Sequence, residues 1–215
     1  MAKKTVVIVD HPSFDRSNAH RRFVEEMRKY PDDILIHNLQ SAYPTGTIDV
    51  ANEHCLIDNN GSIVFEFPIY WFTCPPKTKE WLDKVLTHDW AFKDGHHLKG
   101  RKIGLCVTCG SEEEAYTAQG RHHRSIEEYL ASMQRAFEMC DADYVGTFAL
   151  YGINDAKKVD AEASKRKAEE RERLKTEESR KATANLAKID NIIAQNKERR
   201  ERERVKAERD SRRKW

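Results

Sequence analysis

Short apolar runs alternate with amphipathic segments along the first 150 residues of the chain. Each run has the length and composition of a buried strand, and the five runs span residues 4–10, 33–39, 62–67, 101–107 and 144–150. The segments between them carry apolar residues at helical spacing, over residues 17–29, 49–57, 75–86 and 123–140. Strands that alternate with helices predict a parallel sheet covered by helices on both faces.

Five strands favour a doubly wound α/β sheet of the flavodoxin-like order 2-1-3-4-5 over a six-stranded dinucleotide-binding fold. Ligands of such sheets bind beyond the carboxyl ends of the strands, where the strand order reverses. Three loops leave the predicted strands at this edge, over residues 10–18, 68–74 and 108–122. We therefore expect the functional site to be built from these three loops.

The composition of the chain changes near residue 155. Residues 157–215 contain 21 Lys and Arg against 13 Asp and Glu, whereas the first 156 residues contain 17 against 23. The final segment has no Pro or Gly and is rich in Ala, Glu, Lys and Arg, which predicts a long, charged helical extension. We expect a globular domain over residues 1–155 and a basic helical tail over residues 156–215.

Three roles remain open for this tail. It can be a solvated helix, an arm that docks on a partner subunit or another protein, or a surface for nucleic acid or an anionic membrane. Interspersed acidic residues dilute its positive field, so nucleic acid is the weakest of these expectations.

Cysteine usage and hydropathy indicate where the protein works. The five cysteines are odd in number and irregularly spaced, which argues against a disulfide framework and suits a reducing compartment. No apolar run reaches the roughly 20 residues that a membrane helix needs. We expect a cytoplasmic protein without a transmembrane segment.

The loop after the fourth strand, TCGSEEEAYTAQGRHH, is the stretch most suggestive of chemistry. It opens with residues that permit a tight turn and a close approach to a flat ligand. Tyr116 and His122 follow, six residues apart, with Gly120 between them. A phenol and an imidazole on such a loop can stabilise charge on a bound ring, but the same residues also suit ordinary structural hydrogen bonds.

The loop after the first strand, DHPSFDRSN, has the character of an anion site. Free N–H groups and the helix dipole attract phosphate at the start of a helix. Ser17 and Asn18 can donate to phosphate oxygens and His11 adds a further donor, although Ser17 and Asn18 also suit simple helix capping. The loop has neither the dinucleotide-binding glycine pattern nor a Walker sequence, so neither of those sites is predicted.

The loop after the third strand is the most aromatic part of the chain. Its residues Pro68, Ile69, Tyr70, Trp71 and Phe72 place three rings where the chain leaves the core. Such a surface is typical of a ligand or partner site, with packing at the edge of the core as the alternative.

Together these loops resemble those of the NAD(P)H:quinone oxidoreductases of the flavodoxin-like fold. That family includes the mammalian quinone reductases and the ancillary reductases of bacterial glutathione-gated potassium efflux systems. The resemblance spans roughly residues 4–153 and is carried by three motifs, which are FPIYWFTCPPKTKEWLDKVLTHDWAF, TCGSEEEAYTAQGRHH, and His11 with the helix start at Ser17 and Asn18. Within the second motif the matching residues are Thr108, Gly110, Tyr116, Gln119, Gly120 and His122. Cys109 and Ser111 depart from the family's Thr-Thr-Gly-Gly run, and a side chain at Ser111 is expected to crowd the flavin edge.

The resemblance implies a flavin cofactor, FMN as in the small bacterial members, with FAD as the alternative. Its phosphate would meet His11, Ser17 and Asn18. Its ring would lie along Thr108, Cys109, Gly110 and Ser111 and be lined by Pro68, Ile69, Tyr70, Trp71 and Phe72. Residues that match Trp90 to Phe92 close the substrate side in relatives, often from the partner subunit, so a homodimer is expected.

The resemblance also implies a reaction. NADPH or NADH would give a hydride to flavin N5 and leave, and a quinone or similar electrophile would then take two electrons in the same site, a ping-pong mechanism. Tyr116 and His122 would offset the charge that arises on the flavin. The alternative is a regulatory, redox-sensing subunit of a potassium efflux transporter or another partner, with the tail as its contact arm. A flavodoxin-type electron carrier fits less well, because such carriers lack the Tyr/His loop.

Overall fold

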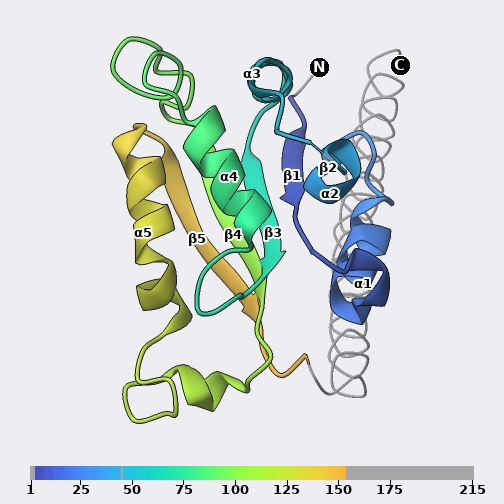
Figure 1. The fold of residues 1–215 in the computed structure, drawn as a ribbon, viewed down its shortest axis with the longest axis vertical. Coiled ribbons are helices and arrows are strands. Elements are labelled where there is room, and N and C mark those ends of the chain that lie inside the picture. Colours follow the sequence, from blue (N-terminus) through green and yellow to red (C-terminus); the bar gives the residue numbers. More distant parts are fainter. Residues whose placement is uncertain (1–2, 45, 154–215) are drawn as a thin grey trace, which may run out of the picture. The chain divides into compact units, whose positions relative to one another are not determined.

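The fold is known from a computed structural model that describes residues 3–44 and 46–153. Five parallel strands form one sheet in the order β2-β1-β3-β4-β5 (Figure 1). The strands are β1 (Thr5–Val9), β2 (Ile34–Asn38), β3 (Ile63–Pro68), β4 (Lys102–Thr108) and β5 (Asp143–Leu150). The order of the strands and their parallel direction confirm the flavodoxin-like sheet that the apolar runs predict.

Strand register brings the predicted loops to one edge of the sheet. Val9 is level with Asn38 on one side and with Glu66 on the other. Pro68 is in turn level with Thr108. The loops that follow β1, β3 and β4 therefore all begin at the carboxyl edge, which is the lower edge in Figure 1.

Helices cover both faces of the sheet. The α-helices are α1 (Asn18–Met27), α2 (Leu39–Ala42), α3 (Val50–Asp58), α4 (Pro76–Val85) and α5 (Ile126–Met139). On one face, Val24 of α1 packs against Val7 and Val9. On the other, the main core joins alternate strand residues such as Ile8 and Phe65 to side chains of α3, α4 and α5. The central strands β1, β3 and β4 are mostly buried, which explains their largely apolar sequences, whereas the edge strands β2 and β5 are more exposed.

Local capping explains where the observed helices differ from the predicted ones. The last described helix begins at Ile126 rather than 123, because Ser125 and Glu128 form a capping box. Ser17 likewise caps α1 rather than belonging to it. Three short elements were not predicted, namely α2 and the 3₁₀ turns η1 (Phe14–Arg16) and η2 (Glu113–Tyr116).

The predicted tail over residues 156–215 and its boundary near residue 155 lie outside the described residues, so both stay predictions. Among the helices that the structure describes, none is long and apolar enough to cross a membrane. All five cysteines are free thiols.

Candidate functional site

Three loops meet at the carboxyl edge of the sheet, as predicted. The loops after β3 and β4 are joined by a hydrogen bond from the backbone N–H of Ile69 to the carbonyl of Thr108, at 2.9 Å. The ring of Phe72 contacts the ring of His122 edge-on, with centroids 5.1 Å apart. The site therefore combines the aromatic loop with the Tyr/His loop.

The loop after β1 leads into the free N-terminus of α1. The hydroxyl oxygen of Ser17 accepts the backbone N–H of His20 at 3.3 Å, so its hydrogen remains able to donate to a ligand. Asn18, the first helical residue, is exposed. His11 is partly buried, and its Nδ1 accepts the backbone N–H of Ser13 at 3.0 Å. This end of a ten-residue helix has the donors and the dipole that an anion requires.

Buried Asp10 fixes the end of β1 relative to α4. One carboxylate oxygen accepts both the backbone N–H and the hydroxyl of Thr78, each at 2.8 Å. The other accepts the side-chain amide of Gln40 at 2.8 Å. Asp10 therefore accepts a backbone N–H that has no partner within the first turn of α4, and it holds the start of the anion loop in place.

The aromatic loop makes a tight turn at the end of β3. Tyr70 and Thr73 exchange two backbone hydrogen bonds, of 2.8 and 2.9 Å. Trp71 and Phe72 lie between them at φ 46° and φ 65°, in the left-handed region that costs a residue with a side chain roughly 1–2 kcal/mol. Trp71 is 92% exposed, whereas Phe72 stacks on Tyr129 of α5 at 4.5 Å. The turn thus presents one indole ring to solvent at the edge of the site.

The loop after β4 turns its first side chains inward. Thr108 and Cys109 are both buried, and the backbone N–H of Cys109 donates to the carbonyl of Leu150 at 2.8 Å. Burial, the largest cause, raises the pKa of the Cys109 thiol to about 12. Gly110 follows without a side chain. A flat ligand at this edge would therefore meet the backbone of the loop rather than a reactive thiol.

Ser111 is tied to two basic side chains of the same loop. Its hydroxyl oxygen lies 3.0 Å from Nε2 of His122 and accepts a hydrogen bond of 2.7 Å from Arg121. A serine at this position therefore orients the His122 ring as well as adding bulk. Whether it also crowds a bound ring stays a prediction.

Tyr116 and His122, six residues apart in the sequence, lie side by side in the structure. Their ring centroids are 4.7 Å apart, and the backbone N–H of His122 donates to Ala115 at 2.9 Å. Gly120 is required for this turn, because a Cβ there would lie 2.2 Å from the carbonyl oxygen of Glu114. Burial is the first cause that raises the pKa of Tyr116 to about 12, and desolvation lowers the pKa of His122. At neutral pH the phenol is therefore a hydrogen-bond donor and the imidazole is uncharged.

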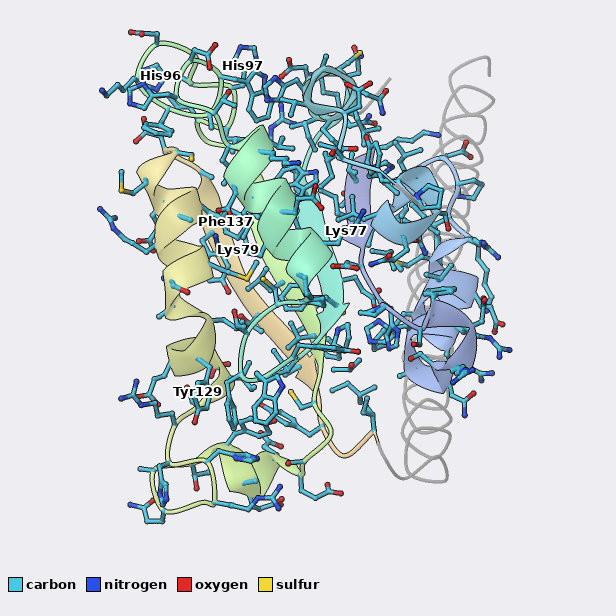
Figure 2. The ribbon with its side chains drawn as sticks, in the orientation of Figure 1. Lys77, Lys79, His96, His97, Tyr129 and Phe137 are labelled. Atoms are coloured by element: carbon cyan, nitrogen blue, oxygen red, sulfur yellow. The ribbon has the colours of Figure 1, made fainter. Side chains whose placement is uncertain are left out.

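Several polar residues of the site were missed from the sequence. Buried His20 contacts Thr108 with one ring nitrogen and Glu66 with the other. Tyr129, at the site end of α5 in Figure 2, donates its hydroxyl to the carbonyl of His122. The sequence held one indication of this contact, because Glu66 lies inside the apolar run of β3 and a buried glutamate needs a hydrogen-bond partner.

Trp90 does not join these loops within the chain. It is buried at the opposite edge of the sheet, where its ring stacks on His54 at 4.0 Å and on His97 at 5.2 Å. Figure 2 shows His96 and His97 at this far end, away from Tyr129. The expected closing role of residues 90–92 would therefore require a second subunit, and it stays a prediction. Among the described residues, no cluster of His, Cys, Asp and Glu is suited to hold a metal ion.

The fold and the three loops define a flavodoxin-like α/β protein with a candidate site at the carboxyl edge of the sheet. The chain belongs to the flavodoxin-like fold family, whose sequence profile matches residues 3–174.

Known proteins of this family resemble most of the chain. General stress protein 14 of Bacillus subtilis is 39% identical over 168 residues, which is 77% of this chain and 95% of that protein. The crystal structure of general stress protein 14 from Treponema denticola in complex with FMN is 40% identical, with a TM-score of 0.72. The likeness covers 76% of this chain and 94% of that one.

Other relatives bear names that state an activity or a partner. The uncharacterized NAD(P)H oxidoreductase YrkL of Bacillus subtilis is 34% identical over 75% of this chain and 92% of its own length. An NADPH-quinone reductase from P. pentosaceus is 26% identical with a TM-score of 0.64, over 69% of this chain and 85% of that one. The glutathione-regulated potassium-efflux system ancillary protein KefG of Cronobacter sakazakii is 29% identical over 69% of this chain and 80% of its own length.

Proposed function

We propose that the protein is an FMN-dependent NAD(P)H oxidoreductase that reduces quinones or similar electrophiles by two electrons in a ping-pong reaction. The observation that carries this proposal is the adjacent Tyr116 and His122 pair, placed beside the aromatic turn at the carboxyl edge. The names of the similar proteins support the cofactor and the class of reaction.

The residues at the carboxyl edge suit FMN. The N-terminus of α1 offers the Ser17 hydroxyl and free backbone N–H groups to the phosphate, with Asn18 and His11 nearby. The loop after β4 offers backbone to a flat ring, because its threonine and cysteine side chains point into the protein. The exposed Trp71 gives the ring an aromatic border. FMN is preferred to FAD because the 40% identical structure holds FMN.

The flavin, when bound, supplies the hydride chemistry by which electrons pass from NAD(P)H to the acceptor. The part of the protein is to place rings and charge. The Tyr116 phenol keeps its proton far above neutral pH, so its hydroxyl remains able to act as a hydrogen-bond donor. His122 is held by Ser111, so its ring direction is set before any ligand arrives.

Two measurements test this proposal. Mass spectrometry of the cofactor released by heat should identify FMN. Oxidation of NADPH and NADH with menadione as acceptor should then show turnover that depends on the bound flavin. A protein that binds no flavin, or that binds it and does not oxidise either nucleotide, would contradict the proposed activity.

We further propose a homodimer. A mostly apolar groove of about 530 Å³ lies between α4 and α5, lined in part by Leu82, Leu86, Phe92 and Met133. Met139, 55% exposed, extends the apolar surface of this groove. A second copy that covered it would remove this surface from water. Light scattering should show a dimer for the full chain and a larger monomer fraction for a Met139→Glu variant. We also propose that the protein is cytoplasmic.

A regulatory role is the second candidate, and the likeness to KefG is the observation that favours it. In that case the protein would bind a transporter or another protein and sense its redox or nucleotide state, with the tail as a contact arm. Bound FMN together with negligible turnover on every acceptor would favour this role. Rapid menadione reduction would favour the enzyme.

A further inference from the structure

Three buried polar side chains from different elements meet at the base of the candidate site. Nε2 of His20 in α1 lies 2.8 Å from the hydroxyl oxygen of Thr108 in β4, and Nδ1 contacts the carboxylate of Glu66 in β3. Each of the three residues is at most 1% exposed. The backbone N–H of His20 also binds the oxygen of Ser17, so His20 connects the start of α1 to the edge of β4.

The other titratable groups around this pair come from β1, the loop after it, and β4. Burial is the largest cause that raises the pKa of Glu66, and the charge of Asp10 acts in the same direction. The His11 ring is 4.5 Å from that of His20, and its pKa is lowered to about 4, first by burial, so His11 is uncharged at pH 7. Cys106 is the neighbour of Glu66 in the strand register. Among the described residues, His20 is therefore the base placed to neutralise Glu66.

Hydrogen-bond geometry permits two charge states of the Glu66–His20 pair. With one proton, on Nδ1, the pair carries a net negative charge and Nε2 accepts from Thr108. With two protons the pair is neutral and Nε2 donates to Thr108, because a proton on Oε2 of Glu66 would lack an acceptor among the described residues. Burial disfavours a net charge, and Asp10 repels a second negative charge, so both effects favour the neutral pair.

Neutrality of the pair has a consequence for anion binding. His20 lies in the first turn of α1, three residues after the Ser17 cap. An uncompensated carboxylate beneath this turn would oppose the attraction of the helix N-terminus for a phosphate. We propose that His20 is a positioning and charge-balancing residue, which retains a proton against Glu66 and thereby permits the flavin phosphate to bind at α1. The identity of the ligand rests on the proposed function.

Affinities for FMN and riboflavin separate a charge effect from a structural one, because riboflavin lacks the phosphate. His20→Asn removes the base but keeps hydrogen-bonding groups beside Glu66 and Thr108. The substitution should weaken FMN binding roughly 10–100-fold, because the uncompensated charge of Glu66 would repel the phosphate. It should change riboflavin binding much less. The double variant His20→Asn/Glu66→Gln, in which both side chains are neutral, should regain FMN affinity close to wild type. Equal losses for both ligands, or no rescue by the second substitution, would overturn the charge-balancing role.

One further measurement on the flavin-free protein completes the test. Imidazole ¹⁵N NMR of the flavin-free protein, with His20 assigned from its absence in the variants, should show a protonated Nε2 at pH 7. An unprotonated Nε2 would overturn the inference even if FMN binds. If FMN does not bind the wild-type protein, the proposed function is overturned instead, and the NMR result still decides the state of His20.

Discussion

The ring of His122 lies 4.7 Å from the ring of Tyr116, and a single serine hydroxyl at position 111 holds its Nε2. This pair comes from the two ends of a short loop that Gly120 allows to close. The arrangement leaves the phenol as a donor and the imidazole fixed in direction.

Replacement of either group should leave flavin bound and slow its reduction. Tyr116→Phe and His122→Ala each remove a group that stabilises developing charge, and such a loss typically slows a reaction about 10²–10⁴-fold, with smaller losses where the second group remains. Stopped-flow reduction by NADPH measures the effect. His123→Asn is the matched control, because His123 is exposed and its φ of 59° suits asparagine. Wild-type rates in both test variants would exclude the proposed roles.

The pH profile of flavin reduction should be level from about pH 7 to 9.5 in protein with FMN already bound. Burial raises the pKa of Tyr116 to about 12, and desolvation lowers the pKa of His122 from its ordinary 6.5, so neither group changes charge in this range. Protonation of His122 should appear only in acid. An alkaline limb near pH 10 that disappears in Tyr116→Phe would show that the phenol titrates normally.

Ser17→Ala together with Asn18→Ala should weaken FMN binding by a few kcal/mol, since a charge-assisted hydrogen bond contributes about 1.5–3 kcal/mol. Loss of a helix cap alone costs about 1 kcal/mol of stability. Ser125→Ala, which removes the cap of α5, is the matched control for that loss. Fluorescence titration should show weaker binding in the double variant and unchanged binding in the control. Equal affinities would mean that Ser17 and Asn18 only cap α1.

Glu53→Gln should destabilise the domain by about 1–3 kcal/mol at pH 7, because it disturbs a buried carboxylate with three donors. Those donors are His37 and Trp81, both at 2.7 Å, and Tyr43 at 2.6 Å. Burial acts to raise the pKa of Glu53, but the hydrogen bonds outweigh it and the pKa lies below the usual 4.5. The stabilisation is therefore present above that value and is lost as pH falls through the lower folded pKa. Urea unfolding should show that the difference in free energy of unfolding between wild type and Glu53→Gln is smaller in acid than at pH 7. The exposed Glu25→Gln control should unfold with the same free energy as wild type at both pH values.

A chain that ends after residue 180 should still fold, dimerise, bind FMN and reduce menadione. The family profile ends at residue 174, and all the proposed flavin contacts lie between His11 and His122. Between residues 181 and 215 the large apolar side chains are few, so their loss should remove a partner contact rather than the core. Light scattering and the menadione assay on this chain provide the measurement. A monomeric or flavin-free product would place the tail within the catalytic dimer.

The sheet and the positions of the three loops could be predicted because they depend on local pattern. The central strands are largely apolar runs, and the parallel order then fixes which loops share an edge. The contact between Tyr116 and His122 depends on the turn at Gly120, where the carbonyl of Glu114 leaves no room for a side chain.

The buried polar contacts could not be predicted, because they join residues distant in sequence. Thr108 and His20 are separated by 88 positions, and nothing near either residue indicates the other. The inward direction of Cys109 follows from its hydrogen bond to Leu150, which depends on the register of β5. Trp90 lies far from the site for a similar reason, since α4 carries the chain to the opposite edge before that residue occurs.

The turn at Trp71 and Phe72 is not optimised for folding alone. Two residues with large side chains hold left-handed backbone angles where glycine or asparagine would be comfortable, at a cost of order 1–3 kcal/mol each. This cost is large beside the net stability of natural domains, which is only about 5–15 kcal/mol. Such a trade is usual where activity and robustness compete. Substitutions that stabilise the domain are therefore expected at this turn, and they would remove the rings that the proposed flavin site uses as its aromatic border.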